Sequence, residues 1–415
     1  MSDEQKVDDK PAIPPPESPK DLAEPKQLTS DKPSDPSPHV VLDIQDAPPE
    51  FSHYQPEISE NDDGDIISHD HHLNQDGEAL YRFLLAHAAR RPSFTVYIGG
   101  THTEHRSRTV SRTVNGRHET HVEHYTETVT DFGFHIDLSK NIVTGPVHWS
   151  YADAEPAYRG LMVRQVQTPT TRRKATSEEI TAHKNREYER TNKGLPPWAS
   201  PGTQSAPQLL QSSTTVRQWA DEYCSSPKIL KEFAYEKFIH GWDLQALEAA
   251  IRESIAETQY RGSVEVQFIT GATKITVRAD NRLSRLLSRR RYVFLLCIVL
   301  VYPFIWLFKR YSSRGGGRWE VCGGAYALKH MVPLDDDNNS FPLPEPLPGQ
   351  PPPEPRAIET ATGEIVKLVG QREGEWFRQW EHTIKRAVVT GMTTTELFQD
   401  VRDAPVDRAA ALDGY

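Results

Sequence analysis

The longest apolar run in the chain extends from Tyr292 to Phe308 and contains no charged residue. It reads YVFLLCIVLVYPFIWLF, with three arginines before it and Lys309 and Arg310 after it. Its 17 residues would form about 25 Å of helix, somewhat less than the roughly 30 Å hydrocarbon core of a bilayer. The pattern predicts one transmembrane helix in contact with lipid, marked by Tyr292, Leu296, Leu300, Pro303, Trp306 and Phe308.

Two alternatives to a straight crossing follow from the same residues. A buried core helix would have this composition, but core helices rarely begin with three arginines and end with Lys-Arg. Pro303 lacks a backbone donor, so it permits a kink or a hairpin that re-enters the same side. Basic residues flank both ends, so the charge rule favours neither orientation strongly. Glycosylation at the sequon Asn338-Asn339-Ser340 would argue against the hairpin.

A polar β-ribbon is predicted around the dipeptide Asn115-Gly116, which readily adopts a type I′ turn. A turn at these residues pairs Arg112 with Glu119 and Arg108 with Glu123, while both faces of the ribbon stay polar. The ribbon is therefore expected to project from the domain. The apolar alternation of FTVYI and FGFHIDL would attach it at its base. The many histidines of the ribbon suggest zinc binding as an alternative, but the register places no two of them opposite each other. The HDHH motif at His69 to His72 is an equally weak candidate. No metal site is therefore predicted.

Helical patterns precede and follow the ribbon. Asp76 is placed as the N-cap of a first helix. After a polar segment, TTVRQWADEYCSS, PKILKEFAYEKFIHGW and DLQALEAAIRESIAETQY predict three consecutive helices. GSVEVQFITGATKITVRAD then predicts a second hairpin. The segment REGEWFRQWEHTIKRAVV predicts an amphipathic helix that packs either on the protein itself or on a membrane surface.

Composition limits how much of the chain can fold. Hydrophobic residues make up 36% and prolines number 32, so long tails beside a smaller folded part are expected. The predicted fold class is α+β, with antiparallel ribbons, a small helical cluster, one transmembrane helix and disordered proline-rich tails. The predicted regions are an acidic, proline-rich tail at 1–75, a helix and hairpin at 76–165, a polar linker at 166–212, a helical cluster and hairpin at 213–281, the membrane segment at 292–308, and a C-terminal region at 311–415 with a proline-rich linker and the amphipathic helix.

Charge and motifs narrow the function only by exclusion. A net charge of -10 argues against a nucleic-acid partner. No phosphate loop, dinucleotide fingerprint, HExxH or GxSxG motif is present, so neither a catalytic residue nor a cofactor is predicted. The three cysteines are widely separated and form no metal pair. The first ten residues are polar and acidic, so a signal peptide is not expected and the N-terminal region is expected in the cytosol.

Several segments resemble a group of fungal membrane proteins of unknown activity. They are NDDGDIISHDHHLNQDGEALYRFLL, HVEHYTETVTDFGFHIDL, DNRLSRLL, and YPFIWLFKR followed by GGGRWEVCGGAYAL. The resemblance covers about two-thirds of the chain. It implies a β-containing soluble part, one membrane segment and a short C-terminal part, but no activity or site residue.

The predicted function is a single-pass, membrane-anchored interaction or scaffold protein, in the endoplasmic reticulum or another endomembrane. Its expected partners are the lipid bilayer and proteins that bind the proline-rich tails or the polar ribbon. The alternatives are a membrane-bound enzyme and a lipid-binding module acting at the bilayer surface. An apolar cavity in the folded part would favour the lipid-binding alternative.

Overall fold

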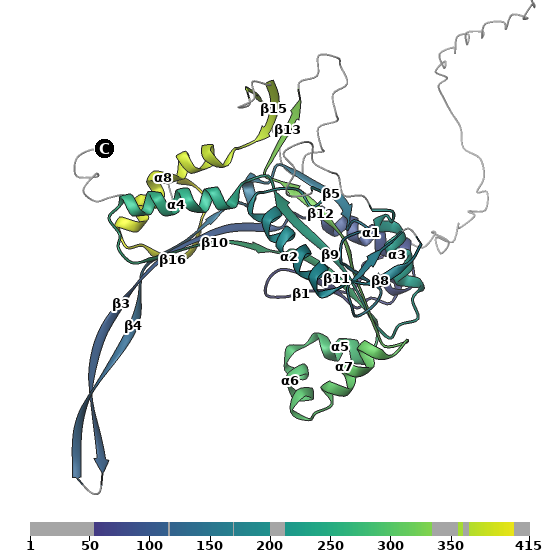
Figure 1. The fold of residues 1–415 in the computed structure, drawn as a ribbon, viewed down its shortest axis with the longest axis horizontal. Coiled ribbons are helices and arrows are strands. Elements are labelled where there is room, and N and C mark those ends of the chain that lie inside the picture. The colour runs from purple at the N-terminus through teal and green to yellow at the C-terminus, as the bar shows by residue number, and fades with distance from the viewer. Residues whose placement is uncertain are drawn as a thin grey trace, which may run out of the picture. The chain divides into compact units, whose positions relative to one another are not determined.

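The computed structural model describes residues 54–114, 117–168, 170–199, 212–333, 356–359 and 365–401. They form a mixed α+β fold with two principal sheets (Figure 1). Several predictions fall outside these residues. They are the tail up to residue 53, the turn at 115–116, the sequon at 338–340 and the proline-rich stretch at 341–355.

The larger sheet has seven strands in the order β1-β2-β11-β9-β12-β5, with β6 also paired to β12. The strands are β1 (Ile58–Glu60), β2 (Ile66–Ser68), β5 (Thr144–Ser150), β6 (Tyr158–Arg159), β9 (Leu230–His240), β11 (Lys274–Arg278) and β12 (Gly316–Ala327). Strand β9 is central and runs parallel to β12 and antiparallel to β11. The sheet therefore joins segments that lie far apart in the sequence.

One face of this sheet is packed against helices α1 (Gly77–Ala88) and α3 (Val216–Ser225). Asp76 caps α1 by accepting a hydrogen bond from the Glu78 amide, as the sequence predicts. The core beneath them contains Phe233 and Tyr235 from β9 and Trp219 from α3. Alternate residues of β9, such as Glu236, therefore point to the opposite face.

The second sheet has the order β10-β3-β4-β16, formed by β10 (Ser263–Gly271), β3 (Ser93–Val114), β4 (Arg117–Asp137) and β16 (Thr393–Phe398). Helices α4 (Leu244–Glu257) and α8 (Glu373–Val389) pack against it through a second core. The base of the ribbon joins that core, with Val96, Ile98, Phe134 and Ile136 fully buried. Beyond its base the β3–β4 ribbon extends away from the sheet (Figure 1).

The predicted register of the ribbon is confirmed along its length. Arg112 pairs with Glu119 and Arg108 with Glu123, and the guanidinium of Arg108 lies 2.9 Å from the Glu123 carboxylate. Cross-strand charge pairs of this kind would be lost on a one-residue slip. The Asn-Gly turn signal and the charge pattern together were therefore sufficient to predict the pairing.

The remaining elements are small. A three-stranded sheet contains β13, β15 and β14, and a two-stranded sheet contains β7 and β8. Their bounds, with those of helix α2 and two 3₁₀ turns, are β7 (Gln165–Gln167), β8 (Arg172–Lys174), α2 (Ser177–Asn192), β13 (Lys329–Pro333), β14 (Arg356–Glu359), β15 (Ile365–Gly370), η2 (His72–Asn74) and η3 (Ser139–Asn141). The capping box of Thr176 and Glu179 starts α2. Helix α2 lies within the predicted 166–212 linker.

Two predictions of local structure are wrong. The segment expected as the second of three helices is strand β9, because its side chains are buried on both faces of a central strand and so carry no simple alternation. The expected second hairpin is also absent, since β10 pairs with β3 and β11 pairs with β9 and β2. The chain passes between the two sheets at Ala272, whose φ is 55°.

The apolar segment departs from the predicted single helix. After α5 (Arg282–Ser288) it forms α6 (Arg290–Ile298) and α7 (Tyr302–Tyr311). Among the residues described, no one helix has the length and apolar character to cross a bilayer. Helices α6 and α7 reach that length and apolar character only when taken together, and a bend of 103° separates them. Pro303 lies in the first turn of α7, where its missing N–H costs no helical hydrogen bond.

Candidate functional site

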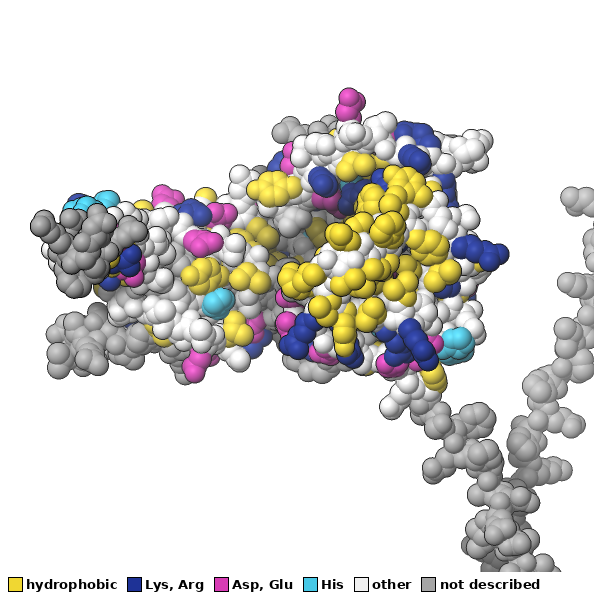
Figure 2. Space-filling model, turned by 90° about the horizontal axis from the view of Figure 1, so that it is seen from below, with side chains coloured by type: hydrophobic (Ala, Val, Ile, Leu, Met, Phe, Trp, Pro, Cys, Tyr) yellow, Lys and Arg dark blue, Asp and Glu magenta, His cyan; other side chains and the backbone are white. Residues whose placement is uncertain are grey.

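Helices α6 and α7 expose apolar side chains rather than burying them. The exposed fractions are 68% for Phe294, 68% for Leu300 and 71% for Phe304. Figure 2 shows hydrophobic side chains gathered on the face seen from below, with basic side chains around them. Hydrophobic residues on soluble surfaces are usually scattered, so a continuous patch on adjoining helices marks a contact surface.

The predicted membrane residues divide between the two sides of this helix pair. Leu300, Trp306, Phe308 and Tyr292 are at least 38% exposed, whereas Leu296 is half-buried. The side facing the protein carries Val293, Tyr302, Ile305 and Lys309, which line a small crevice against β9 and α5. The structure thus brings most of the predicted lipid-facing residues onto one exposed surface.

The bend between α6 and α7 is a Schellman-type helix end. Leu300 adopts a φ of 57°, and its amide donates to the Cys297 carbonyl while the Val301 amide donates to the Leu296 carbonyl. The Val299 amide donates to the Leu295 carbonyl. The amides at the bend are therefore satisfied within the segment. The sequence contains no glycine here to signal a left-handed residue, so the bend was not predicted.

Helix α5 connects this pair to the folded core. His69, from the HDHH motif, hydrogen-bonds through Nε2 to the Ser288 hydroxyl at 2.8 Å and through Nδ1 to the Ala279 carbonyl at 3.2 Å. Arg285 of α5 forms a bidentate pair with Glu57 at 2.8 and 2.9 Å. His69 thus has a structural role, and within the described ranges no group of His, Cys, Asp and Glu side chains is arranged to hold a metal ion.

A cavity of ≈ 720 Å³ lies where the two principal sheets meet, beside α2. The cavity has an apolar wall formed by Phe94, Val266 and Phe268 from the second sheet, by Trp242, and by Phe238 from β9. Its volume lies within the range of small-molecule sites. Sequence reasoning missed this cavity because its walls come from β9 and β10, which were assigned the wrong element or the wrong partner.

Charged groups at the floor of the cavity are paired inside the protein. Lys274 lies 2.8 Å from Glu236, and Glu187 accepts a hydrogen bond of 2.9 Å from the Tyr151 hydroxyl. His183 lies 3.2 Å from the same Glu187 carboxylate. Burial opposes charging of His183, but the neighbouring carboxylates raise its pKa above the usual range. Both carboxylates thus have compensating partners.

Three more of the charged groups that line the cavity have partners within the protein, whereas Glu189 and Lys193 are exposed to solvent. Lys237 donates to backbone carbonyls at the end of α1, at 2.6 and 3.0 Å. Arg190 pairs with buried Glu155 at 2.9 Å, and Glu248 pairs with Arg252 at 2.8 Å. Little of this charge is left to attract a charged ligand.

A second carboxyl lies next to Glu236. Burial and the proximity of Glu236 raise the pKa of Glu320 to about 7, since two adjacent carboxylates resist simultaneous ionisation. Hydrogen bonding and Lys274 hold the pKa of Glu236 low despite its burial. The two residues therefore share one proton near neutral pH. Arg318, 2.8 Å from Glu320, limits the shift.

No protein-family model, no curated protein and no solved structure matches this chain. The functional argument accordingly rests on the geometry of the helix pair and of the cavity.

Proposed function

We propose that the protein is a membrane-attached interaction protein held to the bilayer by the bent pair α6–α7. The observation that carries this proposal is the exposed apolar surface of the pair, with Phe294, Leu300 and Phe304 each at least 68% exposed. Burying such side chains in the acyl region contributes about 25 cal/mol for each Å² removed from water. Water is therefore the unfavourable environment for this surface, and lipid the favourable one.

The geometry of the pair favours insertion into one leaflet. Helices of 9 and 10 residues are each about 15 Å long, roughly half of the hydrocarbon core. A bend of 103° prevents them from adding their lengths into one crossing. The sequence-based single crossing is thus replaced in this proposal by a hairpin that enters and leaves on the same side.

The backbone of the bend suits a lipid environment. Unpaired amides are costly in hydrocarbon, and the amides of Val299, Leu300 and Val301 all donate to carbonyls of α6. These three donors of the irregular segment are therefore satisfied when it enters the acyl region. This property distinguishes the bend from an ordinary surface loop, whose amides rely on water.

Basic residues beside the pair supply the charge complementarity. Arg289, Arg291, Arg310 and Arg314 are all solvent-exposed and flank the apolar surface in sequence. Each basic residue near an anionic membrane contributes about 1 kcal/mol of attraction. Anionic headgroups are consequently the preferred surface.

The interaction role rests on the β3–β4 ribbon. Beyond its base it has no other strand on either edge among the residues described, because β10 covers β3 only through Thr101 and β16 covers β4 only from Gly133. Open strand edges with polar faces can add a partner strand through backbone hydrogen bonds. Protein partners are therefore proposed to bind along the ribbon.

Vesicle flotation of the full chain tests the attachment. The triple variant Phe294→Asp, Leu300→Asp and Phe304→Asp places charges on the apolar surface, so its partitioning into phosphatidylcholine–phosphatidylserine vesicles should fall by at least about tenfold. The matched control is Val122→Asp, Val389→Asp and Leu397→Asp, at positions 46–71% exposed elsewhere.

The control should partition like the unmodified chain. Equal partitioning of both triple variants would contradict the proposal.

A second experiment, cysteine labelling, resolves the topology. Arg289→Cys and Arg314→Cys, made separately with Cys297→Ser, should both react with an impermeant maleimide added outside sealed vesicles. Protection of one site alone would show that the bent pair crosses the bilayer.

A further inference from the structure

We propose that the cavity between the two sheets binds an uncharged amphiphile, an apolar chain whose head carries hydroxyl or ester groups. The binding site is formed by β9, β10, α2 and the start of α4, and contains no residue of α6 or α7. The proposal therefore does not rest on membrane attachment.

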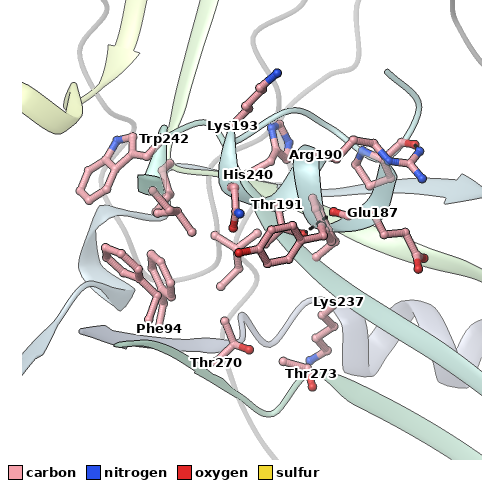
Figure 3. A pocket seen from close by; sticks show the side chains of 18 of the residues that line it. Phe94, Glu187, Arg190, Thr191, Lys193, Lys237, His240, Trp242, Thr270 and Thr273 are labelled. Atoms are coloured by element: carbon pink, nitrogen blue, oxygen red, sulfur yellow. Dashed lines mark hydrogen bonds between the residues drawn. The ribbon is translucent and has the colours of Figure 1, made fainter. Parts of the chain in front are cut away.

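The apolar wall defines one end of the ligand. Phe94 and Trp242 lie on one side of the cavity, and Thr270, the cross-strand partner of Phe94, lies beside this apolar wall (Figure 3). Val266 and Phe268 continue the apolar wall along β10. A chain of methylene groups placed there would contact carbon on several sides, which is the arrangement that apolar ligands require.

Neutral polar groups adjoin the apolar wall. His240, Thr270 and Thr273 line the cavity, and the described part of the chain provides no hydrogen-bond partner for these three side chains. Burial and His330 lower the pKa of His240 to about 4, so its neutral ring offers one donor and one acceptor. Two hydroxyls and one imidazole can thus both donate to and accept from a ligand head.

The charges around the cavity exclude a charged head. Glu236 is paired with Lys274, Glu187 contacts His183 and Tyr151, and Lys193 extends away from the cavity (Figure 3). Lys237 donates to backbone carbonyls, and Glu189 is exposed to solvent. A ligand ammonium or carboxylate would therefore lose its hydration beside charges that are already bound or solvated, and burying such an ion is unfavourable. Hydroxyl and ester groups carry no such cost.

The direct test uses 1-monooleoylglycerol as the probe, with oleate and oleylamine as charged analogues of the same chain length. The full chain carries the Phe294→Asp, Leu300→Asp and Phe304→Asp substitutions, so that the helix pair does not capture the probe. Equilibrium dialysis below the aggregation concentration should show one monooleoylglycerol per chain. Both charged analogues should bind at least about tenfold more weakly.

Variants in the wall locate the site. Thr270→Phe fills the cavity and His240→Leu removes the imidazole, so each should weaken monooleoylglycerol binding by at least about tenfold. Thr128→Phe, at an exposed position of the ribbon, is the matched control and should bind normally. Circular dichroism of each variant verifies the fold.

Two results would overturn the proposal. One is equal affinity for monooleoylglycerol, oleate and oleylamine, and the other is normal binding by folded Thr270→Phe and His240→Leu chains.

Incubation of the unmodified chain with vesicles containing the probe distinguishes a ligand taken from the bilayer from a ligand free in solution. Loss of probe from the vesicles in equimolar amount to the protein indicates extraction from the bilayer, whereas binding only from solution indicates a free amphiphile. Failure of vesicle attachment in the flotation test would leave this binding unaffected.

Discussion

Helices α7 and α8 are both rich in aromatic residues, yet α7 exposes these side chains whereas α8 buries them. Trp306 of α7 is 48% exposed, whereas Trp376 of α8 is 1% exposed. In α8 the apolar residues form one stripe, containing Trp376, Trp380 and Ile384, and the other faces are polar. In α7 apolar residues surround most of the helix, so a single protein surface cannot bury them.

The difference teaches that the arrangement of apolar residues, more than their number, indicates where a helix packs. The α8 stripe fits the core of the second sheet, where Trp376 and Trp242 lie with ring centroids 5.9 Å apart. Of the two environments that the sequence left open for this amphipathic helix, packing on the protein is confirmed. Helix α7 has no such partner for its outer side.

The largest expected effect is a difference in stability between two tryptophan substitutions. Trp376→Ala should lower the free energy of unfolding by about 3–5 kcal/mol, because it removes a fully buried ring and leaves a void. Trp306→Ala should change it by less than about 0.5 kcal/mol. Urea denaturation of the full chain in one fixed detergent measures both values.

Trp376→Phe serves as the control for loss of volume and should fall between these extremes. Equal destabilisation by Trp376→Ala and Trp306→Ala would break the comparison. In that case α7 would contribute to the folded core as much as α8 does.

The same contrast between buried and exposed positions extends to charge. Glu320 is 13% exposed and its pKa is raised to about 7, so the folded state binds its proton more tightly than the unfolded state. Its contribution to stability is present below the unfolded pKa of 4.5 and is lost as pH rises toward 7. Glu320→Gln should remove this loss, on the order of 2 kcal/mol.

Unfolding free energies measured from pH 4.5 to pH 8 provide the test. The control is Glu189→Gln, an exposed position on α2, which should leave the pH profile unchanged. Parallel profiles of the wild type and Glu320→Gln through this interval would contradict the assigned proton on Glu320. The depressed pKa of Glu236 acts in a lower pH window. The depressed pKa of His240 acts on both chains and cancels in the difference between the two profiles.

The sequence predicted correctly the features that depend on interactions between residues close together in the chain. The ribbon register followed from one turn dipeptide and from two cross-strand charge pairs, and it is confirmed. The N-cap Asp76 likewise needed only its neighbours. These features were accessible because few distant contacts contribute to them.

Features that depend on distant contacts were missed. Strand β9 has the composition of an amphipathic helix, and only pairing with β11 and β12 makes it a strand. The cavity was invisible for the same reason, because Phe94, His240 and Thr270 are brought together by tertiary structure alone. The apolar run was predicted to form one helix, whereas the structure bends it at one leucine with a positive φ.

The smallest effect concerns that leucine and tests whether the pair is bent in the membrane-bound state. A left-handed conformation costs a residue with a Cβ about 1 kcal/mol, and glycine avoids this cost. If the bend persists, Leu300→Gly should preserve hydrogen-exchange protection of the Val301 amide, whereas Leu300→Val, with a β-branched side chain, should reduce it by about fivefold.

A continuous helix predicts the reverse order. Glycine within a helix costs about 1 kcal/mol relative to alanine, and valine costs less. Exchange measured on the full chain bound to vesicles therefore distinguishes the two geometries by sign rather than by size. Ile298→Val, placed at the last residue of α6, controls for the β-branched side chain itself. Greater protection in Leu300→Val than in Leu300→Gly would mean that lipid straightens the pair, and the contrast with α8 would then be one of environment as well as pattern.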